Sequence, residues 1–422
     1  MTARDTHPFS HLPVLIIGGG PIGLAAAVHL RARGIEPVVV EAGPEAGAGI
    51  RTWGHVRVFS PWKHMVDPLA RERLEAEGWR MPDPEALPTG HDFVDGWLAP
   101  LSEHLGDDVV LDTRVTAVSR YGIDKTRSPG RERLPFQVEA VGPEGPRRWL
   151  ARAVIDASGT IHRPNPLGAN GVPLYGEGPR VDGLWYGIPD VLGEARSRFA
   201  GRRTLVVGSG HSAFNSVLSL VEVAAAEPGT ELTWAIRRPR PDTLFGGEES
   251  DELHARGTLG TRMRQAVRHG AVALESGFRA IDLRRTDEGL RVGDGERDLG
   301  PFDNVVVNAG YRPDLDVLSE LRLGLDSALE APTALAPLID PNVHSCGTVY
   351  PHGRRELSHP EPDFWIVGMK SYGRAPTFLL LTGYEQVRSV AAVPVKTDGS
   401  TPASFARLGA IDSASRSVPG NG

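Results

Sequence analysis

Two glycine-rich turns carry the residue types and spacing that bind a pyrophosphate. One spans residues 18–23 and the other 208–213, and each lies between an apolar run and a helix-like stretch. In such a turn the first glycine permits a tight bend, the second lets the backbone approach the phosphates, and the third position lets the helix pack close to the strand. The pair indicates an enzyme that moves electrons between two dinucleotides. The predicted contacts are Gly18, Gly20, Pro21, Ile22 and Gly23 in the first turn, and Gly208, Ser209, Gly210, His211 and Ser212 in the second.

The residues that end the second strand of each unit distinguish the two dinucleotides. Glu41 lies where an acidic side chain meets a ribose hydroxyl, and an acid there disfavours a 2′-phosphate. This favours FAD or NAD, with a solvated acid at a strand end as the alternative. Arg237 and Arg238 hold the corresponding place in the second unit, and their forked donors match a phosphate, which favours NADPH. A solvated basic loop is the alternative, since Arg240 lies close by.

Composition excludes several classes of function. The net charge is −7 and the pI is near 6.1, which gives no electrostatic case for nucleic acid or an anionic membrane as partner. No apolar run reaches the ~18–20 residues that a transmembrane helix needs, and the first residues do not resemble a signal peptide. Cys346 is the only cysteine, so no internal disulfide or dithiol pair can form, which fits the cytoplasm. The spacing of His344, Cys346, His352 and His359 matches no compact site, so we predict no metal.

Two β-α-β patterns position the glycine turns. The expected strands lie at 14–18, 37–41, 109–111, 135–141 and 231–236, with strand-and-turn elements at 153–160, from 203 and at 302–313, and the expected helices lie at 21–33, 91–105 and 212–226. A Pro- and Gly-rich stretch, 163–190, is interpreted as a domain crossing. We predict an α/β protein with two Rossmann-like domains of the three-layer ββα type, followed by a disordered tail.

In five features taken in order, the chain resembles the two-dinucleotide-binding-domain flavoproteins and, within them, the single-component flavin-dependent monooxygenases. The features are the first glycine turn with Glu41, Asp156-Ala157-Ser158-Gly159, the second glycine turn, Asn308-Ala309-Gly310-Tyr311-Arg312-Pro313, and Phe364-Trp365-Ile366-Val367-Gly368. The resemblance implies FAD in the first site, NADPH in the second, and an NADPH domain inserted into the FAD domain. The expected divisions are 1–165 and 301–395 for FAD, 166–300 for NADPH, and 396–422 for the tail.

The chain also departs from that family. The linking motif F-x-G-x-x-x-H, whose place is residues 183–190, is not recognisable, which indicates a divergent branch. The segments 53–62 and 369–378 are similar to a bacterial branch sometimes found with arsenic resistance functions.

The resemblance implies further residues around the flavin. Arg51 and Trp53 lie on the loop that should pass beside FAD, although Trp53 could equally fill the core. Ser60 and Lys63 should lie near the isoalloxazine and are polar candidates for catalysis, with surface-loop chemistry as the alternative. Lys370 is a third candidate, which adds positive charge beside the flavin or forms a structural ion pair. Other implied cofactor contacts are Val115, for which sheet packing is the alternative, and Ser158, Gly159, Gly310, Gly368, Met369 and Thr377.

Two enzymatic functions fit these observations. In the first, NADPH reduces FAD and a C4a-peroxyflavin formed from O₂ transfers one oxygen atom to a small soft nucleophile or carbonyl compound. In the second, the reduced flavin passes its electrons to a quinone or a protein acceptor, without dithiol chemistry. A non-enzymatic binding module is a third reading, which two intact glycine turns disfavour. The expected partners are a small-molecule substrate and O₂, with no nucleic acid and no membrane, in a monomer or homodimer.

Overall fold

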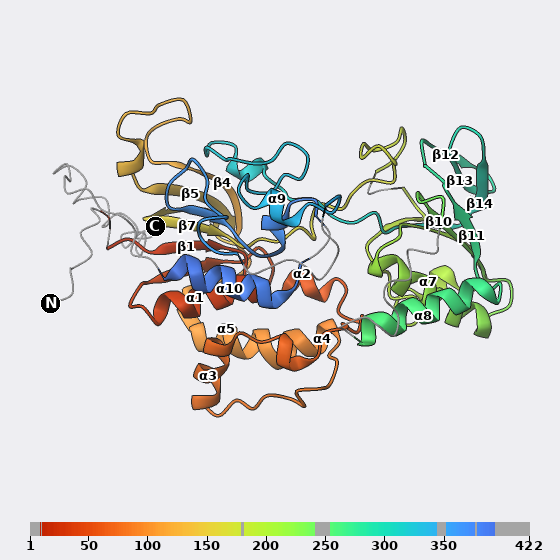
Figure 1. Cartoon of the computed structure of the whole chain (residues 1–422), viewed down its shortest axis with the longest axis horizontal. Helices are drawn as coiled ribbons and strands as arrows, with labels where there is room; N and C mark the ends of the chain where they lie inside the picture. The colour runs from red at the N-terminus through yellow and green to blue at the C-terminus, as the bar shows by residue number, and fades with distance from the viewer. Residues whose placement is uncertain are drawn as a thin grey trace, which may run out of the picture.

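The computed structural model describes residues 9, 11–178, 181–240, 254–343, 352–375 and 378–392. They form two α/β units that lie side by side along the long axis of the molecule, as Figure 1 shows. Each unit combines a five-stranded parallel sheet with helices and with a three-stranded antiparallel sheet. This architecture confirms the predicted fold class of two Rossmann-like, three-layer domains.

The first unit uses segments from both ends of the chain. Its parallel sheet has the order β16-β7-β1-β2-β3, so the central strand β1 carries the first glycine turn at its carboxyl end. The strands are β1 (Val14–Ile17), β2 (Pro37–Val40), β3 (Val109–Val110), β7 (Ala153–Asp156) and β16 (Phe364–Ile366). One face of this sheet is covered by helices α1 (Pro21–Arg31) and α10 (Leu380–Ala391), and α1 in turn packs against α3 (Pro68–Ala76) and α5 (Ala99–Leu105). The other face is covered by the antiparallel strands β4 (Arg114–Arg120), β5 (Phe136–Gly142) and β6 (Gly145–Ala151).

The second unit repeats this plan. Its sheet has the order β11-β10-β9-β15-β8, and β9 carries the second glycine turn. The strands are β8 (Leu184–Tyr186), β9 (Arg203–Val207), β10 (Glu231–Ile236), β11 (Ala273–Ser276) and β15 (Asn304–Val307). Helices α7 (His211–Ala226) and α8 (His254–Arg268) pack together, and the antiparallel strands are β12 (Asp282–Thr286), β13 (Gly289–Gly293) and β14 (Asp298–Phe302). The predicted helix at 91–105 is present as α4 (Gly90–Phe93), a π-helical turn (Val94–Leu98) and α5.

Strand β15 corrects the predicted boundary at 300/301. It pairs in parallel with β9, Asn304 opposite Thr204, so it belongs to the sheet of the second unit and not to that of the first. The sequence could not assign this strand to one unit, because an apolar strand followed by a turn of small residues has the same pattern in either sheet. The chain returns to the first unit only after Val307.

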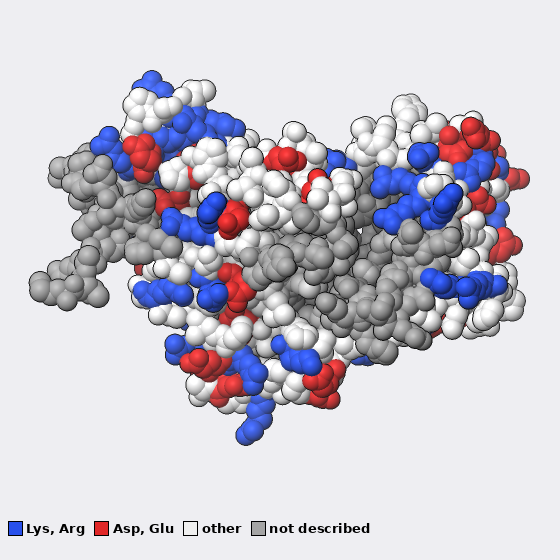
Figure 2. Space-filling model, in the orientation of Figure 1, with Lys and Arg blue, Asp and Glu red and all other residues white. Residues whose placement is uncertain are grey.

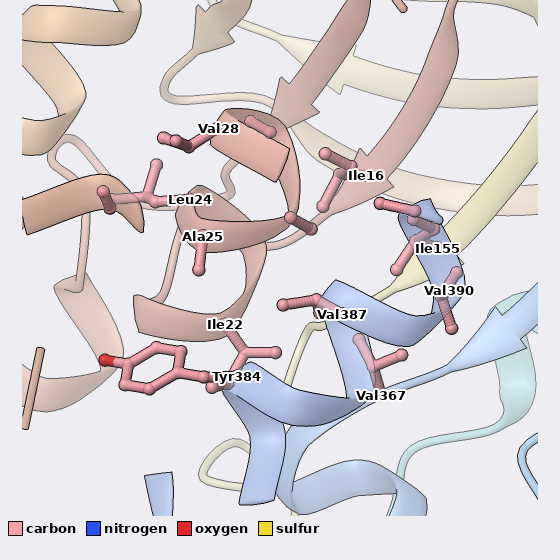
Figure 3. Close-up of a cluster of buried hydrophobic side chains, with 14 of the residues drawn as sticks. Ile16, Ile22, Leu24, Ala25, Val28, Ile155, Val367, Tyr384, Val387 and Val390 are labelled. Atoms are coloured by element: carbon pink, nitrogen blue, oxygen red, sulfur yellow. The ribbon is translucent and has the colours of Figure 1, made fainter. Parts of the chain in front are cut away.

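Side-chain alternation along β1 fills both layers of the first unit. Ile16 faces the helices, whereas Leu15 and Ile17 face the antiparallel sheet, and all three are buried. Figure 3 shows α1 and α10 meeting over this sheet, with Ile22 close to the side chains of α10. The Tyr384 hydroxyl donates a hydrogen bond of 2.6 Å to the carbonyl of Met65. Each fully buried aliphatic side chain contributes about 1.5–3 kcal/mol, so the packing of these layers stabilises the first unit.

The two segments that cross between the units pair with each other. Pro164 and Tyr311 form an antiparallel bridge. The amide of Asn165 donates to the carbonyl of Gly310 (2.8 Å), and the amide of Arg312 donates to the carbonyl of Arg163 (3.0 Å). We call residues 163–165 and 310–312 the crossing ribbon. It makes the junction a paired structure rather than two separate linkers.

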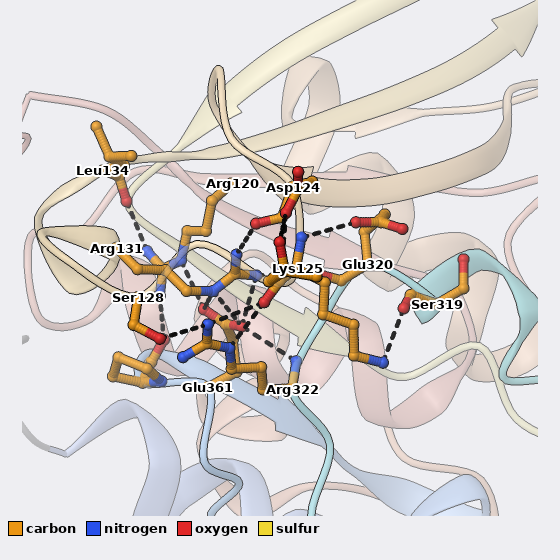
Figure 4. A network of polar contacts seen from close by, with 12 residues as sticks. Arg120, Asp124, Lys125, Ser128, Arg131, Leu134, Ser319, Glu320, Arg322 and Glu361 are labelled. Atoms are coloured by element: carbon orange, nitrogen blue, oxygen red, sulfur yellow. Dashed lines mark hydrogen bonds and ion pairs between the residues drawn. The ribbon is translucent and has the colours of Figure 1, made fainter.

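A buried charged network joins three distant segments of the first unit (Figure 4). Glu361 accepts hydrogen bonds from Arg120 (2.8 Å) and from Arg131 (2.9 Å). The side chain of Glu361 is 0 % exposed, and those of Arg120 and Arg131 are 1 % and 4 % exposed. Burial alone would raise the pKa of Glu361, but the hydrogen bonds from Arg131 and Arg120 lower it overall. The network holds the segment before β16 against β4 and the turn that precedes β5.

Charges of both signs are interspersed over the face of the molecule that Figure 2 shows, and neither unit presents there a surface of one sign. Within the described ranges, no helix is long and apolar enough to cross a bilayer.

We expect Glu361→Gln to lower the free energy of unfolding by about 3–5 kcal/mol, because it leaves two buried guanidinium groups without their carboxylate. Since the pKa of Glu361 is lowered in the folded state, its stabilisation is present above the unfolded pKa and is lost as pH falls through the folded value. Urea unfolding at several pH values measures both effects. The control is Glu385→Gln, whose exposed pair with Arg388 is worth about 0–1 kcal/mol. Equal losses in the two variants would contradict this account.

Candidate functional site

The three glycines of the first turn perform three different structural tasks. Gly18 has φ +99°, and a methyl group added to it would lie 2.8 Å from Cα of Ser158. Around Gly20 no atom lies within 4 Å of an added methyl group, so the space above it is open. A methyl group on Gly23 would lie 2.0 Å from the carbonyl oxygen of Gly18. The turn thus combines a tight bend, an open backbone and close helix packing, as a pyrophosphate cradle requires.

The second turn repeats this geometry. Gly208 has φ +140°, and an added methyl group would lie 2.2 Å from the carbonyl oxygen of Asn308, in the turn after β15. Gly210 again faces open space, with no atom within 4 Å. Neither α1 nor α7 has a side-chain hydrogen bond capping its first residues. Both helix N-termini therefore keep backbone N–H groups for a phosphate.

Glu41 is positioned by the backbone of the first unit. Its Oε2 accepts the amide of Gly19 (2.6 Å), and its Oε1 accepts the amide of Gly43 (2.8 Å). These bonds fix the carboxylate beside the glycine turn, and each oxygen retains acceptor capacity for a ribose hydroxyl.

A pocket at the carboxyl end of the first sheet brings together several predicted residues: Gly18, Glu41, Val115, Ser158, Gly159 and Lys370. Its wall also includes residues that no motif indicated: Thr113, Arg114, His162, Arg163, Asp314 and Val317. They lie at the start of β4, in the crossing ribbon and in the segments beside it, which sequence spacing does not relate to the glycine turn. Gly368 adjoins the same turn, because a methyl group on it would lie 3.2 Å from Cγ1 of Ile22. Met369 is half-buried in the same 368–372 turn.

Lys370 forms the structural ion pair that was one of its two predicted roles, and it also lies in the wall of the pocket, so its catalytic role stays a prediction. Its Nζ donates to Oδ2 of Asp156 (2.7 Å) and to the hydroxyl of Ser158 (3.0 Å). The side chains of Lys370 and Asp156 are 1 % and 0 % exposed. Because the ammonium group is already paired, it holds the 368–372 turn to the end of β7 at the wall of the pocket. Gln386 fixes the other side of this turn, accepting the amide of Gly368 (2.7 Å).

Ser60 and Lys63 are not brought to the pocket. The short helical turn Trp62–His64 buries the Trp62 ring and directs Lys63 outward. Lys63 forms an ion pair with Glu85 (2.8 Å) in which both side chains are exposed. Ser60 makes no side-chain hydrogen bond within the described ranges. This contact is the surface-loop alternative for Lys63, and its catalytic role stays a prediction.

Arg51 and Trp53 also lie outside the pocket wall. Arg51, at the end of α2 (Ala48–Arg51), donates to Glu45 (2.9 Å) and to Asp95, and these hydrogen bonds raise its pKa. Its charge is thus balanced without a phosphate. The ring of Trp53 packs against Gly90, where an added methyl group would lie 3.1 Å away. Trp53 is half-buried at this contact, so both alternatives for it stay predictions.

The second dinucleotide site meets the first unit at an aromatic contact. The ring of Phe59 lies 5.1 Å from that of His211, the first residue of α7. Arg237, directly after β10, donates to the carbonyl of Ala169 (3.1 Å), and Arg238 is exposed beside it. Gly310, with φ +87°, lies in the crossing ribbon. Thr377 and Cys346 lie outside the described residues.

We expect Lys370→Met to lower the free energy of unfolding by about 3–5 kcal/mol and to weaken FAD retention, because the buried Asp156 carboxylate loses its counter-charge. The double variant with Asp156→Asn should recover part of this loss. Lys63→Met is the matched control, since its exposed ion pair is worth about 0–1 kcal/mol. Thermal unfolding and the flavin content after gel filtration measure the effects. Similar losses for the two lysines would contradict the structural role of Lys370.

Comparison with known proteins gives three kinds of match. Residues 13–156 match the family described as FAD dependent oxidoreductase. The ferredoxin–NADP reductase of Thermus thermophilus is 25% identical over 348 residues, which cover 80% of this chain and 85% of that protein. The solved bacillithiol disulfide reductase of Bacillus cereus has a TM-score of 0.68 at 19% identity, covering 91% of this chain and 98% of that one. The ornithine N-hydroxylase of Kutzneria sp. 744, solved with reduced FAD, NADP⁺ and L-ornithine, has a TM-score of 0.58 at 16% identity, covering 90% and 97%.

The two solved structures show that the fold is that of two-domain flavoproteins. The family match supports the coarser functional prediction, an FAD-dependent oxidoreductase. The predicted cofactors, FAD and NADPH, agree with the names of the family and of these relatives.

Proposed function

We propose that this protein is an NADPH-dependent flavin monooxygenase that inserts one oxygen atom from O₂ into a small soft nucleophile or a carbonyl compound. The observation that carries the proposal is the contact between Phe59 and His211. The contact holds a segment of the first unit against the start of α7, directly after the second glycine turn, which supports a junction where two dinucleotides meet. Hydride transfer requires such an arrangement, because the two dinucleotides must meet within bonding distance.

FAD would be held by residues already in place. The turn at Gly18 and Gly20 with the first turn of α1 would bind its pyrophosphate, Glu41 its ribose, and the backbone at Val115 its adenine. When bound, the flavin supplies the redox chemistry, since it accepts hydride from NADPH and reacts with O₂. The protein supplies orientation and a dry wall, of which the buried Lys370–Asp156 pair is part.

A reductase is the second candidate function. The similarity to a ferredoxin–NADP reductase over most of both chains favours it. In that case the flavin would pass electrons to a quinone or a protein acceptor. Cys346 is the only cysteine in the chain, so a reductase with a cysteine pair of its own is not the form it would take.

Turnover under isotopically labelled O₂ distinguishes the two functions. The FAD-loaded protein is supplied with NADPH and a panel of amines, sulfides and ketones, and the products are examined by mass spectrometry. We expect one labelled oxygen atom in a product for each NADPH consumed. Fast NADPH oxidation that requires a quinone or ferredoxin, with no label in any product, would instead establish the reductase.

NADPH selectivity is assigned to the two arginines after β10. We expect the double variant Arg237→Gln, Arg238→Gln to raise KM for NADPH about tenfold or more, because charge-assisted bonds to the 2′-phosphate are lost. The KM for NADH should change little, since NADH lacks this phosphate. Arg262→Gln, in an exposed ion pair with Glu222 on α7, is the control. Steady-state kinetics with both nucleotides measure the outcome, and an equal rise in both KM values would contradict the assignment.

Several finer predictions are part of this proposal. They are the arsenic-related branch, a cytoplasmic location, and a monomer or homodimer. After purification in air, size-exclusion chromatography with light scattering measures whether the protein is a monomer or a homodimer.

A further inference from the structure

Two arginine side chains converge beside the crossing ribbon. A methyl group added at Gly171 would lie 3.7 Å from Nη2 of Arg312 and 4.0 Å from Nη1 of Arg374. Arg312 comes from the segment that returns from the second unit, and Arg374 follows the 368–372 turn at the pocket wall. Two guanidinium groups therefore face one small region at the junction of the units.

Both arginines are held in place before any ligand binds. Nε of Arg312 donates to Oδ1 of Asn165 (2.8 Å), and Nη2 donates to the carbonyl of Gly171 (3.0 Å). The backbone of Arg374 is fixed by Gly373, which has φ +59° and approaches the carbonyl of Leu329 so closely that an added methyl group would lie 1.9 Å away. Such preorganisation reduces the entropy lost when a ligand is bound.

The three arginines of this region differ in their direct partners. Arg163 is paired with Asp314 (3.0 Å) and Asp316 (3.4 Å), and Arg374 is paired with Glu330 (2.7 Å). Arg312 contacts only the neutral acceptors of Asn165 and Gly171, and no carboxylate within the described ranges pairs with it. Burial first, and then the like charge of Arg374, lower the pKa of Arg312, while the charge of Glu330 opposes them. Among the residues that the structure describes, the half-buried guanidinium group of Arg312 thus has no carboxylate in direct contact.

We propose that Arg312 and Arg374 form a binding site for an oxoanion, a carboxylate or phosphate group carried by the substrate. Guanidinium groups bind such anions through paired N–H donors, and the Arg374 side chain is 39 % exposed, so the site can be reached. The site adjoins the FAD pocket through Arg163, whose carbonyl accepts the Arg312 amide. An acidic substrate anchored here would lie beside the crossing ribbon, next to the wall of the pocket. The oxoanion site itself is inferred from the structure alone, and only the statement that its ligand is a substrate rests on the proposed function.

NADPH is the other source of the same chemistry, because Arg237 contacts Ala169 on the same loop as Gly171. Two places are already assigned to the phosphates of NADPH, the α7 turn and the arginines after β10. Saturation with NADP⁺ therefore separates the two sources. With NADP⁺ in excess, the arginine site remains free to bind phosphate if it is a substrate site, whereas NADP⁺ occupies it if it is part of the dinucleotide site.

The experiment measures the binding of inorganic phosphate to the full-length, FAD-loaded protein saturated with NADP⁺, by isothermal titration calorimetry. We expect binding to the wild type, with Kd raised about tenfold or more in Arg312→Gln and in Arg374→Gln, because each loses charge-assisted hydrogen bonds. Arg262→Gln, at an exposed ion pair on α8, should bind as the wild type does. Arg312→Lys, which keeps the charge but not the fork, should give an intermediate Kd.

Unchanged phosphate binding in Arg312→Gln and Arg374→Gln would overturn the inference. So would loss of wild-type binding on addition of NADP⁺, which would give the site to the dinucleotide. If Arg312→Gln fails to retain FAD, Arg374→Gln provides the same test at a more exposed position. No turnover is needed, so a failure of labelled oxygen transfer with intact phosphate binding would reject only the proposed function.

Discussion

The close approach of each glycine turn to the turn of a neighbouring strand is the constraint on which the rest of this structure depends. In the first unit Gly18 lies against Ser158, and in the second Gly208 lies against Asn308. A side chain at either glycine would push apart two strands that must stay paired, β1 from β7 and β9 from β15. The second glycine of each turn faces open space, as a phosphate would require. Each turn thus combines close strand pairing with an open backbone.

Buried charges hold the divided first unit together. Glu361 and Lys370 lie on the returning segment, and their partners, Arg120 with Arg131 and Asp156, lie on the part of the chain that precedes the second unit. Ion pairs of this kind contribute little net energy compared with apolar packing, but they penalise any arrangement that separates the partners. Helix α10 adds the apolar contact with α1 that makes the return favourable. Apolar packing stabilises the first unit, and the buried ion pairs specify how its two chain segments align with each other.

Motifs with a fixed local spacing were predictable, and contacts between distant segments were not. The glycine turns and Glu41 follow from spacing within a single β-α-β unit, and the structure places them as expected. Lys370 meets Asp156 across 214 positions, and no pattern near either residue specifies that pair. Lys63 was assigned to the flavin by analogy, yet a neighbouring exposed carboxylate, Glu85, takes its charge. Arg312 belongs to the motif at 308–313, but only the structure shows that its side chain converges with that of Arg374 beside Gly171.

The crossing ribbon has a consequence for how such a protein can be assembled. Because 163–165 and 310–312 are hydrogen-bonded to each other, the second unit leaves and re-enters its host at a single point. To the host sheet, the whole insertion is equivalent to one long hairpin loop, and the entropic cost of closing such a loop grows only slowly with its length. The inserted unit can therefore be exchanged for another nucleotide-binding module, or the chain circularly permuted within it, while the register of the first sheet is preserved.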